Sequence, residues 1–372
     1  ARPNNDFFNT LSHERTSSLP RCNSVKVESL TRVAGLGDLC AGIALQVSID
    51  LILSFSGMQR EGRLMARRTI GQEGFSFATG TKTSDLDALA ALIDWGDADA
   101  LMAPISDAAT GEQGWPPLCL LKALLLARWY DLSDVKLAEA LDDRASFRRF
   151  CGFSKSEPTP ERTAFVRFRR VLANLALGEK LFEAITEQLC RRQVSVKRGT
   201  LVDATIIASA SKDDEEARWV KHRNRKAVHG YKAHVACDED TALIERLEVT
   251  PANVNDGKAG CGIIPDDPGD VYADSAYRGQ RFRDAVEQRG GRAHVVVTGI
   301  WARGDDEAAA KLKAINGPIH EVRGRIEKIF GTCKQHYGLR RMPHRGIGKA
   351  LLHVLLTAIA YNMKRGLNLQ RA

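Results

Sequence analysis

Three acidic residues occupy positions from which they could do chemistry. Asp203 interrupts an apolar, β-branched run at residues 200–207, Asp274 ends a short apolar run, and Glu327 lies within a helical pattern. A carboxylate in a buried strand costs desolvation energy unless it is paired or binds a metal. If the three carboxylates converge, they form a site of hard oxygen ligands that suits Mg²⁺ or Mn²⁺. The spacing alone leaves open the ordinary alternative, in which each residue caps a turn or forms a salt bridge.

The helical pattern around Glu327 carries basic residues on the same side. At about 100° per residue, Arg323, Glu327 and Lys334 lie within roughly 40° of one another. The adjoining side is apolar and consists of Ile326, Ile329, Phe330 and Cys333. We therefore expect the apolar side to pack on a sheet while Arg323, Glu327 and Lys334 face a cleft. Basic groups beside a metal-binding carboxylate suit a phosphate-bearing substrate.

The elements that would position these residues follow from hydrophobic periodicity. Helical spacing predicts helices at 282–289, 321–336 and 347–364. β-Branched and alternating runs predict strands at 200–207, 230–237, 242–250, 271–274 and 293–298, the second and third forming a hairpin. This order indicates a mixed sheet with helices packed on it, in the α+β or mixed fold class. We expect residues 193–366 to form one domain of this kind.

The preceding segment, residues 67–192, is expected to form an all-helical domain. The predicted helices span 118–130, 135–141, 146–150, 162–175 and 181–192. We expect Ser133 to cap the second of them, and Thr159 with Pro160 to mark the start of the fourth.

Residues 1–66 form an uncertain leader or extension. The first 57 residues lack a clear period and carry equal numbers of acidic and basic residues. Methionines at 58 and 65 are followed or flanked by arginines. One hypothesis places the native start at one of them, and the alternative is a genuine extension.

The formal net charge of +8 and the pI near 9.1 admit a polyanionic partner without establishing one. The charge is concentrated in two segments, 144–170 and 320–349, each with eight basic and two acidic residues. By contrast, residues 83–113 contain seven acidic residues and no Lys or Arg. The two basic segments therefore predict local surfaces that bind DNA phosphates, with solvated faces as the alternative.

Particular basic residues are predicted to contact DNA. In the helical segment, two arginine-bearing helices around residues 152–160 could form a helix-turn-helix-like reader, and the alternative is a bundle with a solvated basic face. The residues predicted to bind DNA or phosphate are Arg148, Arg149, Arg167, Lys221, Arg223, Arg225, Arg323 and Lys334. Trp219 and Trp301 could stack on an unpaired base, although ordinary packing is the favoured interpretation.

Composition also excludes several classes of protein. The eight cysteines form no CxxC pair, so a zinc site or a compact disulfide framework is not expected, and the thiols suit a reducing cytoplasm. No run of 18 apolar residues occurs, so we expect no membrane span and a cytoplasmic protein that joins the nucleoid when it is bound to DNA.

Several sequence segments resemble a known family. Over residues 67–365 the chain is similar to the DDE transposases of bacterial insertion sequences, in the IS-four/IS-five superfamily and nearer the IS-five side. Val202-Asp203-Ala204-Thr205 and Tyr272-Ala273-Asp274 match the motifs of the first two catalytic aspartates. Arg323, Glu327 and Lys334 fit the third motif, Y-(2)-R-(3)-E-(6)-K, with His320 in place of its tyrosine. The matching core and helical segments are 230–232, 250–256, 115–117, 132–134 and 147–152.

The resemblance implies a fold, a site and a reaction. It implies a ribonuclease-H-like catalytic core at 193–366 behind the helical domain at 67–192. Asp203, Asp274 and Glu327 would be both catalytic residues and ligands of two Mg²⁺ or Mn²⁺ ions. The reaction would cut double-stranded DNA at the terminal inverted repeats of the element and join the 3′-OH ends to target DNA, with a homodimer in the synaptic complex. The alternatives are an inactive or domesticated DNA-binding protein and a metal-dependent nuclease of the same fold.

Overall fold

The computed structural model describes residues 68, 70–71, 84–105, 114–192, 197–221, 226–299 and 302–371. All of them belong to one compact unit, Arg63–Ala372. The predicted extension at 1–66 lies outside the described residues, as do Arg223, Arg225 and Trp301. Among the described residues, no helix has the length and apolar character needed to cross a membrane.

The segment that precedes the sheet is helical, as predicted. Its helices are α2 (Asp85–Ala91), α3 (Trp95–Leu101), α4 (Pro117–Trp129), α5 (Asp134–Asp143), α6 (Ala145–Cys151), α7 (Arg162–Asn174) and α8 (Leu177–Arg191). The Ser133 side chain caps α5 by accepting a hydrogen bond from the Lys136 backbone, which confirms that expectation. At α7 the N-cap is Glu161 and no side chain caps the helix. The Thr159 hydroxyl instead donates to the Asp142 carboxylate.

A six-stranded mixed sheet follows. Its strands are β1 (Gly199–Ala208), β2 (Arg218–Val220), β3 (Val228–Asp238), β4 (Ile244–Pro251), β5 (Asp270–Ala273) and β6 (Arg292–Val295). β1, β5 and β6 run parallel to one another, whereas β3 is antiparallel to β1 and to β4, so the predicted hairpin is confirmed. The order is β3-β1-β5-β6, with β2 and β4 both paired to β3. The short strand β2 was not expected from the sequence.

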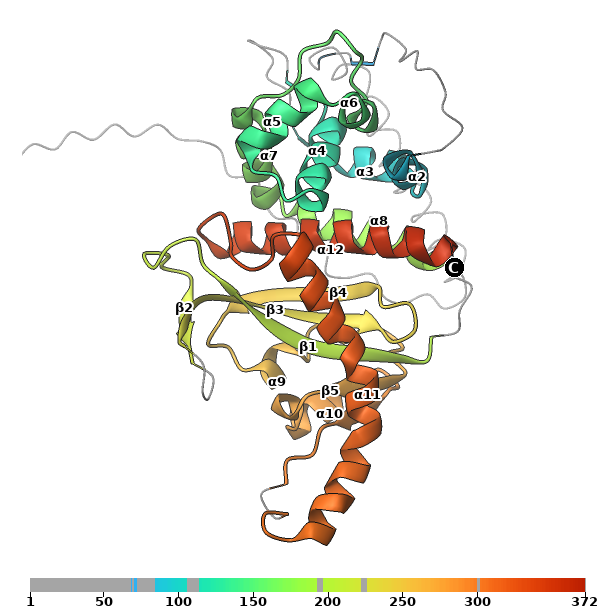
Figure 1. The fold of residues 1–372 in the computed structure, drawn as a ribbon, viewed down its shortest axis with the longest axis vertical. Helices are drawn as coiled ribbons and strands as arrows, with labels where there is room; N and C mark the ends of the chain where they lie inside the picture. The colour runs from blue at the N-terminus through green and yellow to red at the C-terminus, as the bar shows by residue number, and fades with distance from the viewer. Residues whose placement is uncertain are drawn as a thin grey trace, which may run out of the picture. The chain divides into compact units, whose positions relative to one another are not determined.

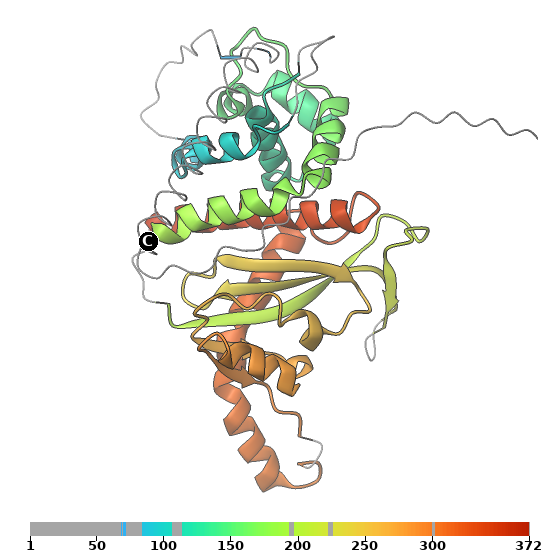
Figure 2. The ribbon, with the colours of Figure 1, turned by 180° about the vertical axis from the view of Figure 1, so that it is seen from behind.

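Helices cover both faces of this sheet. α9 (Asp256–Ala259), the 3₁₀ turn η2 (Ser275–Tyr277) and α10 (Gln280–Glu287) lie on one side, and the long helices α11 (Asp306–His336) and α12 (Ile347–Arg371) lie on the other. Figures 1 and 2 show α11 crossing the sheet obliquely, and α8 and α12 lying side by side between the sheet and the other helices.

α11 is longer than the helix predicted at 321–336. It begins at Asp306 and continues through Pro318. Proline removes a backbone donor and disfavours a helix interior, so the sequence around it argues against a continuous helix. A tertiary contact holds this part of the helix. The Asn316 side chain accepts a hydrogen bond from the Val297 backbone N–H and donates one to its carbonyl oxygen, both at 2.9 Å.

The hydrophobic core has two parts. The larger joins the helical segment to one face of the sheet through α11 and α12, and includes Leu125, Phe165, Leu201, Ile326 and Ile359. The smaller lies on the opposite face, between the sheet and α10, and includes Val202, Tyr277 and Phe282. The larger core is shared, so the helical and sheet segments pack as one body. The domain boundary between 192 and 193 stays a prediction.

Candidate active site

Asp203 and Asp274 lie on neighbouring parallel strands. In the register of β1 and β5, Val202 is paired with Ala273, and the two aspartates come directly after this pair. Asp203 continues along β1, whereas Asp274 leaves β5 and caps η2 by accepting a hydrogen bond from the Ser275 N–H at 2.6 Å. The sheet therefore brings together two acidic residues that are far apart in the sequence, and their spacing in the chain could only suggest this.

Arg323 of α11 joins both carboxylates. Its Nη2 lies 3.1 Å from Asp203 Oδ2, and its Nη1 lies 3.7 Å from Asp274 Oδ1. The Arg323 side chain is 8% exposed, the Asp203 side chain 19% and the Asp274 side chain 46%. The site is consequently open on the Asp274 side and closed by α11 on the Asp203 side.

Burial dominates the electrostatics of Asp203. Burial raises the pKa of this carboxyl to about 6, although the Arg323 charge and a hydrogen bond from the Ala204 N–H act in the opposite direction. The nearby charges of Asp274 and Asp256 raise it further. A buried carboxylate with acidic neighbours is stabilised by any cation that reaches it, and such groups are frequent at functional sites.

Glu327 lies one helical turn beyond Arg323 and is exposed. No group of three His, Cys, Asp or Glu side chains close enough to hold a metal occurs within the described ranges. The structure therefore brings together Asp203, Asp274 and Arg323, while a shared site with Glu327 stays a prediction. Lys334 lies two turns further along α11 and is half-buried.

A second polar group lies next to the two aspartates and was not singled out from the sequence. The Lys232 ammonium, 7% exposed, forms an ion pair with Asp256 at 2.6 Å and also donates to the Val254 carbonyl oxygen. His234 is fully buried, and its Nδ1 lies 4.0 Å from the Asp256 carboxylate. Burial lowers the pKa of His234 to about 4, so its ring is neutral at pH 7.

The sequence contained a signal for the polar group around Lys232 and Asp256. Lys232 and Asp256 belong to the two core segments, 230–232 and 250–256, that carried the family resemblance. Both residues look like ordinary surface charges until β3 and α9 place them beside Asp203.

The residues present suit a cation with oxygen ligands. Asp203 and Asp274 together hold the Arg323 guanidinium, which shows that a positive charge is stabilised between them. Two side-chain atoms nearby, Tyr277 Oη and Arg323 Nε, are buried and have no hydrogen-bond partner among the residues that the structure describes. A bound ion with its water shell would supply partners for such groups. The two aspartates therefore fit a divalent ion, and the fit of Glu327 rests on its place in the motif.

The arginines of the helical segment that were predicted to contact DNA differ in burial and in their partners. Arg148 is 6% exposed, and its guanidinium donates to the carbonyl oxygens of Ser154, at 3.0 and 2.8 Å, and of Glu157. These bonds hold the loop after α6 and leave Arg148 little accessible surface, so Arg148 has a structural role and its contact with a phosphate stays a prediction. Arg149 forms a bidentate ion pair with Asp87, at 2.8 and 2.9 Å.

Arg167 and Lys221 differ from these arginines because both are exposed. Neither forms an ion pair with any residue that the structure describes. Trp219 in β2 is 54% exposed and lies over the His229 ring at 5.2 Å between centroids. The two ring planes are inclined by 43°, and the exposed Trp219 side chain lies two residues before Lys221 in the chain.

Comparisons with known families match the two segments separately. A model described as "Transposase DDE domain" matches residues 195–363, which contain the sheet, Asp203, Asp274 and Arg323. A second, described as "Transposase domain (DUF772)", matches residues 78–171 of the helical segment. Among solved structures, the chain has a remote likeness to a piggyBac transposase in a synaptic complex with hairpin DNA. The two share 10% sequence identity over 76% of this chain and 72% of that one, with a TM-score of 0.43. The chain thus contains the DDE domain of a transposase and is an enzyme of DNA cleavage and strand transfer.

Proposed function

We propose that the protein is the transposase of a bacterial insertion sequence of the IS-five type. It binds the terminal inverted repeats of its element, cleaves the DNA at the ends and joins the 3′-OH ends to target DNA. The observation that carries this proposal is the pair Asp203 and Asp274 on neighbouring parallel strands. The sheet also supports a ribonuclease-H-like core, because β3 is antiparallel to β1, β2 and β4, while β5 and β6 run parallel to β1.

The proposed chemistry assigns a role to each residue of the site. DDE transposases generally depend on divalent metal ions. Asp203, Asp274 and Glu327 would hold two of them, Mg²⁺ or Mn²⁺, which supply a nucleophile at neutral pH and stabilise charge on the phosphate. Asp203 is suited to this role because its carboxylate is buried and favours a cationic partner. Arg323 orients both aspartates in the absence of DNA and is near enough to meet a scissile phosphate.

Cations around the site are proposed to hold the DNA strands. Lys334 on α11, Lys221 after the end of β2 and Arg167 on α7 supply positive charge, and Arg223 and Arg225 stay in this proposal from the sequence. Each phosphate neutralised by such a group releases counterions, so binding should weaken steeply with added salt. We further propose a homodimer in the synaptic complex and association with the nucleoid, because two element ends must meet for joining.

The test separates a transposase from a nuclease of the same fold. Purified protein is incubated with Mg²⁺ and two labelled duplexes of equal length, one ending in the inverted repeat of the element and one with that repeat scrambled. We expect cleavage at the element end, followed by joining of that end to a supercoiled plasmid. Equal cleavage of both duplexes without joined product would contradict the transposase proposal and favour the nuclease.

A further inference from the structure

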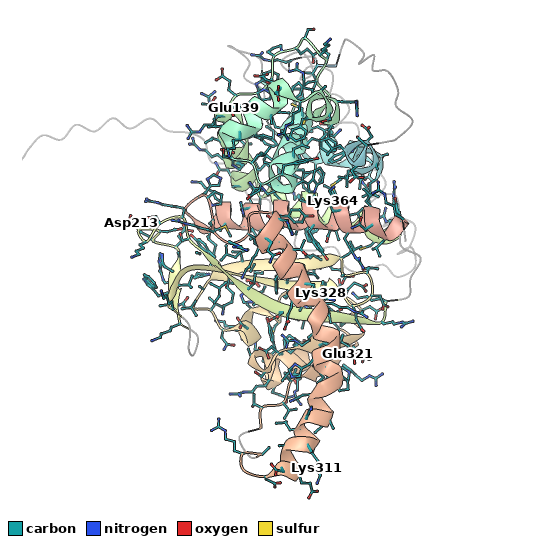
Figure 3. All side chains as sticks on the ribbon, in the orientation of Figure 1. Glu139, Asp213, Lys311, Glu321, Lys328 and Lys364 are labelled. Atoms are coloured by element: carbon teal, nitrogen blue, oxygen red, sulfur yellow. The ribbon has the colours of Figure 1, made fainter. Side chains whose placement is uncertain are left out.

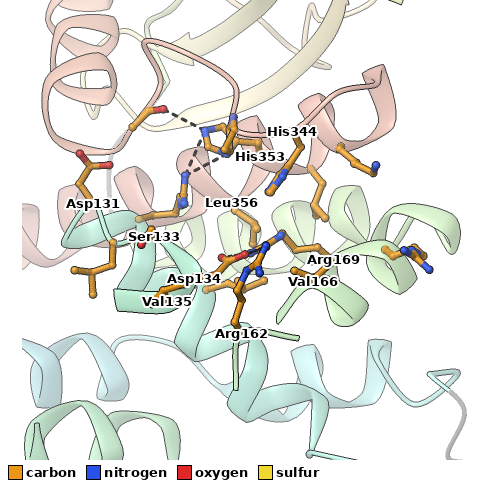
Figure 4. Close-up of a pocket in the computed structure, with 18 of the residues that line it drawn as sticks. Asp131, Ser133, Asp134, Val135, Arg162, Val166, Arg169, His344, His353 and Leu356 are labelled. Carbon is orange, nitrogen blue, oxygen red and sulfur yellow. Dashed lines mark hydrogen bonds and ion pairs between the residues drawn. The ribbon is translucent and has the colours of Figure 1, made fainter. Parts of the chain in front are cut away.

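A cavity of about 530 Å³ lies between the helical segment and the C-terminal helix. Its walls come from α4, α5 and α7 on one side, and from the segment 338–349 and α12 on the other. Figure 4 shows Arg162, Asp134 and Arg169 directed toward His344 and His353 across this cavity. None of its lining residues belongs to the group around Asp203. Its volume is typical of a site for a small organic ligand.

The lining of this cavity is strongly basic. Two carboxylates, Asp131 and Asp134, face six cations, which are Arg128, Arg162, Arg169, Arg170, Arg341 and Lys349. Asp134 is already engaged by Arg169 in a bidentate pair, with Nη1 2.9 Å from Oδ1. Arg162, Arg170 and Lys349 form no ion pair with any residue in the described ranges. A surplus of positive charge therefore remains inside the cavity.

Arg128 extends this charge to the inner wall. Its Nη1 lies 3.1 Å from Nδ1 and 3.3 Å from Nε2 of His353, so its side-chain partner is an imidazole rather than a carboxylate. Burial, with the Arg128 charge second, holds the pKa of His353 well below its usual range, and that ring is neutral. Burial lowers the pKa of Arg128 itself to about 10, so it stays charged at pH 7. Neutral His353 cannot balance this cation. The charges of Asp131 and Asp134 act on it, but Arg128 forms no ion pair with any carboxylate that the structure describes.

The remaining walls are apolar and suit the organic part of a ligand. Leu124, Leu132, Val135, Val166, Leu352 and Leu356 line the cavity beside the cations. A guanidinium presents planar paired donors that match phosphate oxygens, whereas apolar walls accept a sugar or a base.

From this combination we infer that the cavity binds a nucleotide through its phosphate group. Two sources share this chemistry, a nucleotide unit of a DNA strand and a free mononucleotide. The DNA source rests on the proposed function, whereas the free nucleotide does not. The site joins the helical segment to α12, so an occupied cavity also stabilises the packing of these two parts.

The test compares two variants that lose equal charge from the helical segment. Arg162→Ala/Arg170→Ala removes two exposed cations of the cavity that form no ion pair with the described residues. The control, Lys136→Ala/Lys180→Ala, removes two exposed lysines that do not line it. Binding of dAMP is measured by calorimetry, and binding of a labelled duplex by fluorescence anisotropy at several salt concentrations. Thermal unfolding verifies that both variants fold.

We expect dAMP to bind the wild type and the control equally, and the cavity variant about tenfold more weakly or worse. For the duplex, we expect the cavity variant alone to lose about one unit from the slope of log K against log salt concentration, since one phosphate contact contributes about that much. Loss in both assays shows that free and strand nucleotides share the cavity, and loss with the duplex alone assigns it to DNA. Equal behaviour of the two variants in both assays overturns the inference.

A second variant pair tests the inner wall. Arg128→Lys keeps the charge and is expected to retain part of the binding, whereas Arg128→Met is expected to lose it. Both readouts measure binding, so they stay valid even if the protein fails to cleave its element ends. A failure of the proposed function and a failure of this inference are thereby distinguished.

Discussion

Arg323 Nη2 lies 3.1 Å from Asp203 Oδ2, although 120 residues separate the two in the sequence. The same guanidinium reaches Asp274, so one side chain of α11 links the helix to two neighbouring strands of the sheet. Because Arg323 is buried, this link is formed in a region of reduced dielectric, where charges interact more strongly than at the surface. The position of α11 over the sheet and the arrangement of the two aspartates are therefore coupled.

The first prediction concerns this coupling. Replacing Arg323 with Ala leaves the buried Asp203 carboxylate without its cation, and we expect the free energy of unfolding to fall by about 3 kcal/mol or more. Arg323→Lys should recover part of that loss. Urea denaturation in the presence of EDTA measures the effect. Lys328→Ala, an exposed substitution on the same helix (Figure 3), should stay within about 0.5 kcal/mol of the wild type. Similar stability of the Arg323→Ala and Lys328→Ala variants would show that the ion pair does not hold the helix.

The pH dependence of stability follows from Asp203. Its pKa is about 6 in the folded protein and ordinarily 3.8, the value expected in the unfolded chain, so between these values the folded state binds the extra proton. The unfolding free energy of the metal-free wild type should therefore fall, relative to Asp203→Asn, as pH rises from 3.8 to about 6. The change should be about 3 kcal/mol, and the difference should be constant above that range. Urea denaturation of both proteins with EDTA at several pH values measures the difference, because their other groups titrate alike. A difference that is flat with pH would contradict the burial of this carboxyl.

Some features of the site could be predicted from the sequence, and others could not. The elements that carry Asp203 and Asp274 are marked by apolar runs, and their order is local information. That the two strands are neighbours is a property of the whole sheet, and no local pattern encodes it. The burial of Arg148 could not be predicted either, because an arginine in a basic run is indistinguishable from its exposed neighbours until the loop carbonyls fold around it. The helix predicted at 321–336 likewise begins earlier, at Asp306, and continues through Pro318, where the Asn316 side chain contacts the Val297 backbone.

The contrast between two arginines of the helical segment can be tested. Arg148→Ala removes several buried hydrogen bonds to carbonyl oxygens, and we expect a loss of about 2–3 kcal/mol in stability. Arg167→Ala should leave stability within about 0.5 kcal/mol and weaken duplex DNA binding, because that side chain is exposed. Chemical denaturation and fluorescence anisotropy, applied to both variants, measure the two effects. Unchanged stability of the Arg148→Ala variant would show that these hydrogen bonds do not hold the loop.

The ion pair of Lys232 and Asp256 should behave as a unit. Asp256→Asn leaves a buried ammonium unpaired, and we expect a loss of about 3 kcal/mol, with a comparable loss for Lys232→Met. The double variant should be less destabilised than the sum of the two, since neither charge then remains buried alone. A double-mutant cycle measured by chemical denaturation gives the coupling energy. Additive effects would mean that the two side chains do not interact.

The role of the two aspartates is tested most directly by cleavage of a labelled element end in Mg²⁺. The wild type should release the 3′-OH end, and Asp203→Asn and Asp274→Asn should each lower the cleavage rate by about a thousandfold or more. Glu327→Gln should show the same loss, whereas Glu321→Gln, an exposed residue of the same helix, should retain activity. Cleavage by the Asp203→Asn or Asp274→Asn variant at the wild-type rate would contradict the assignment of this site.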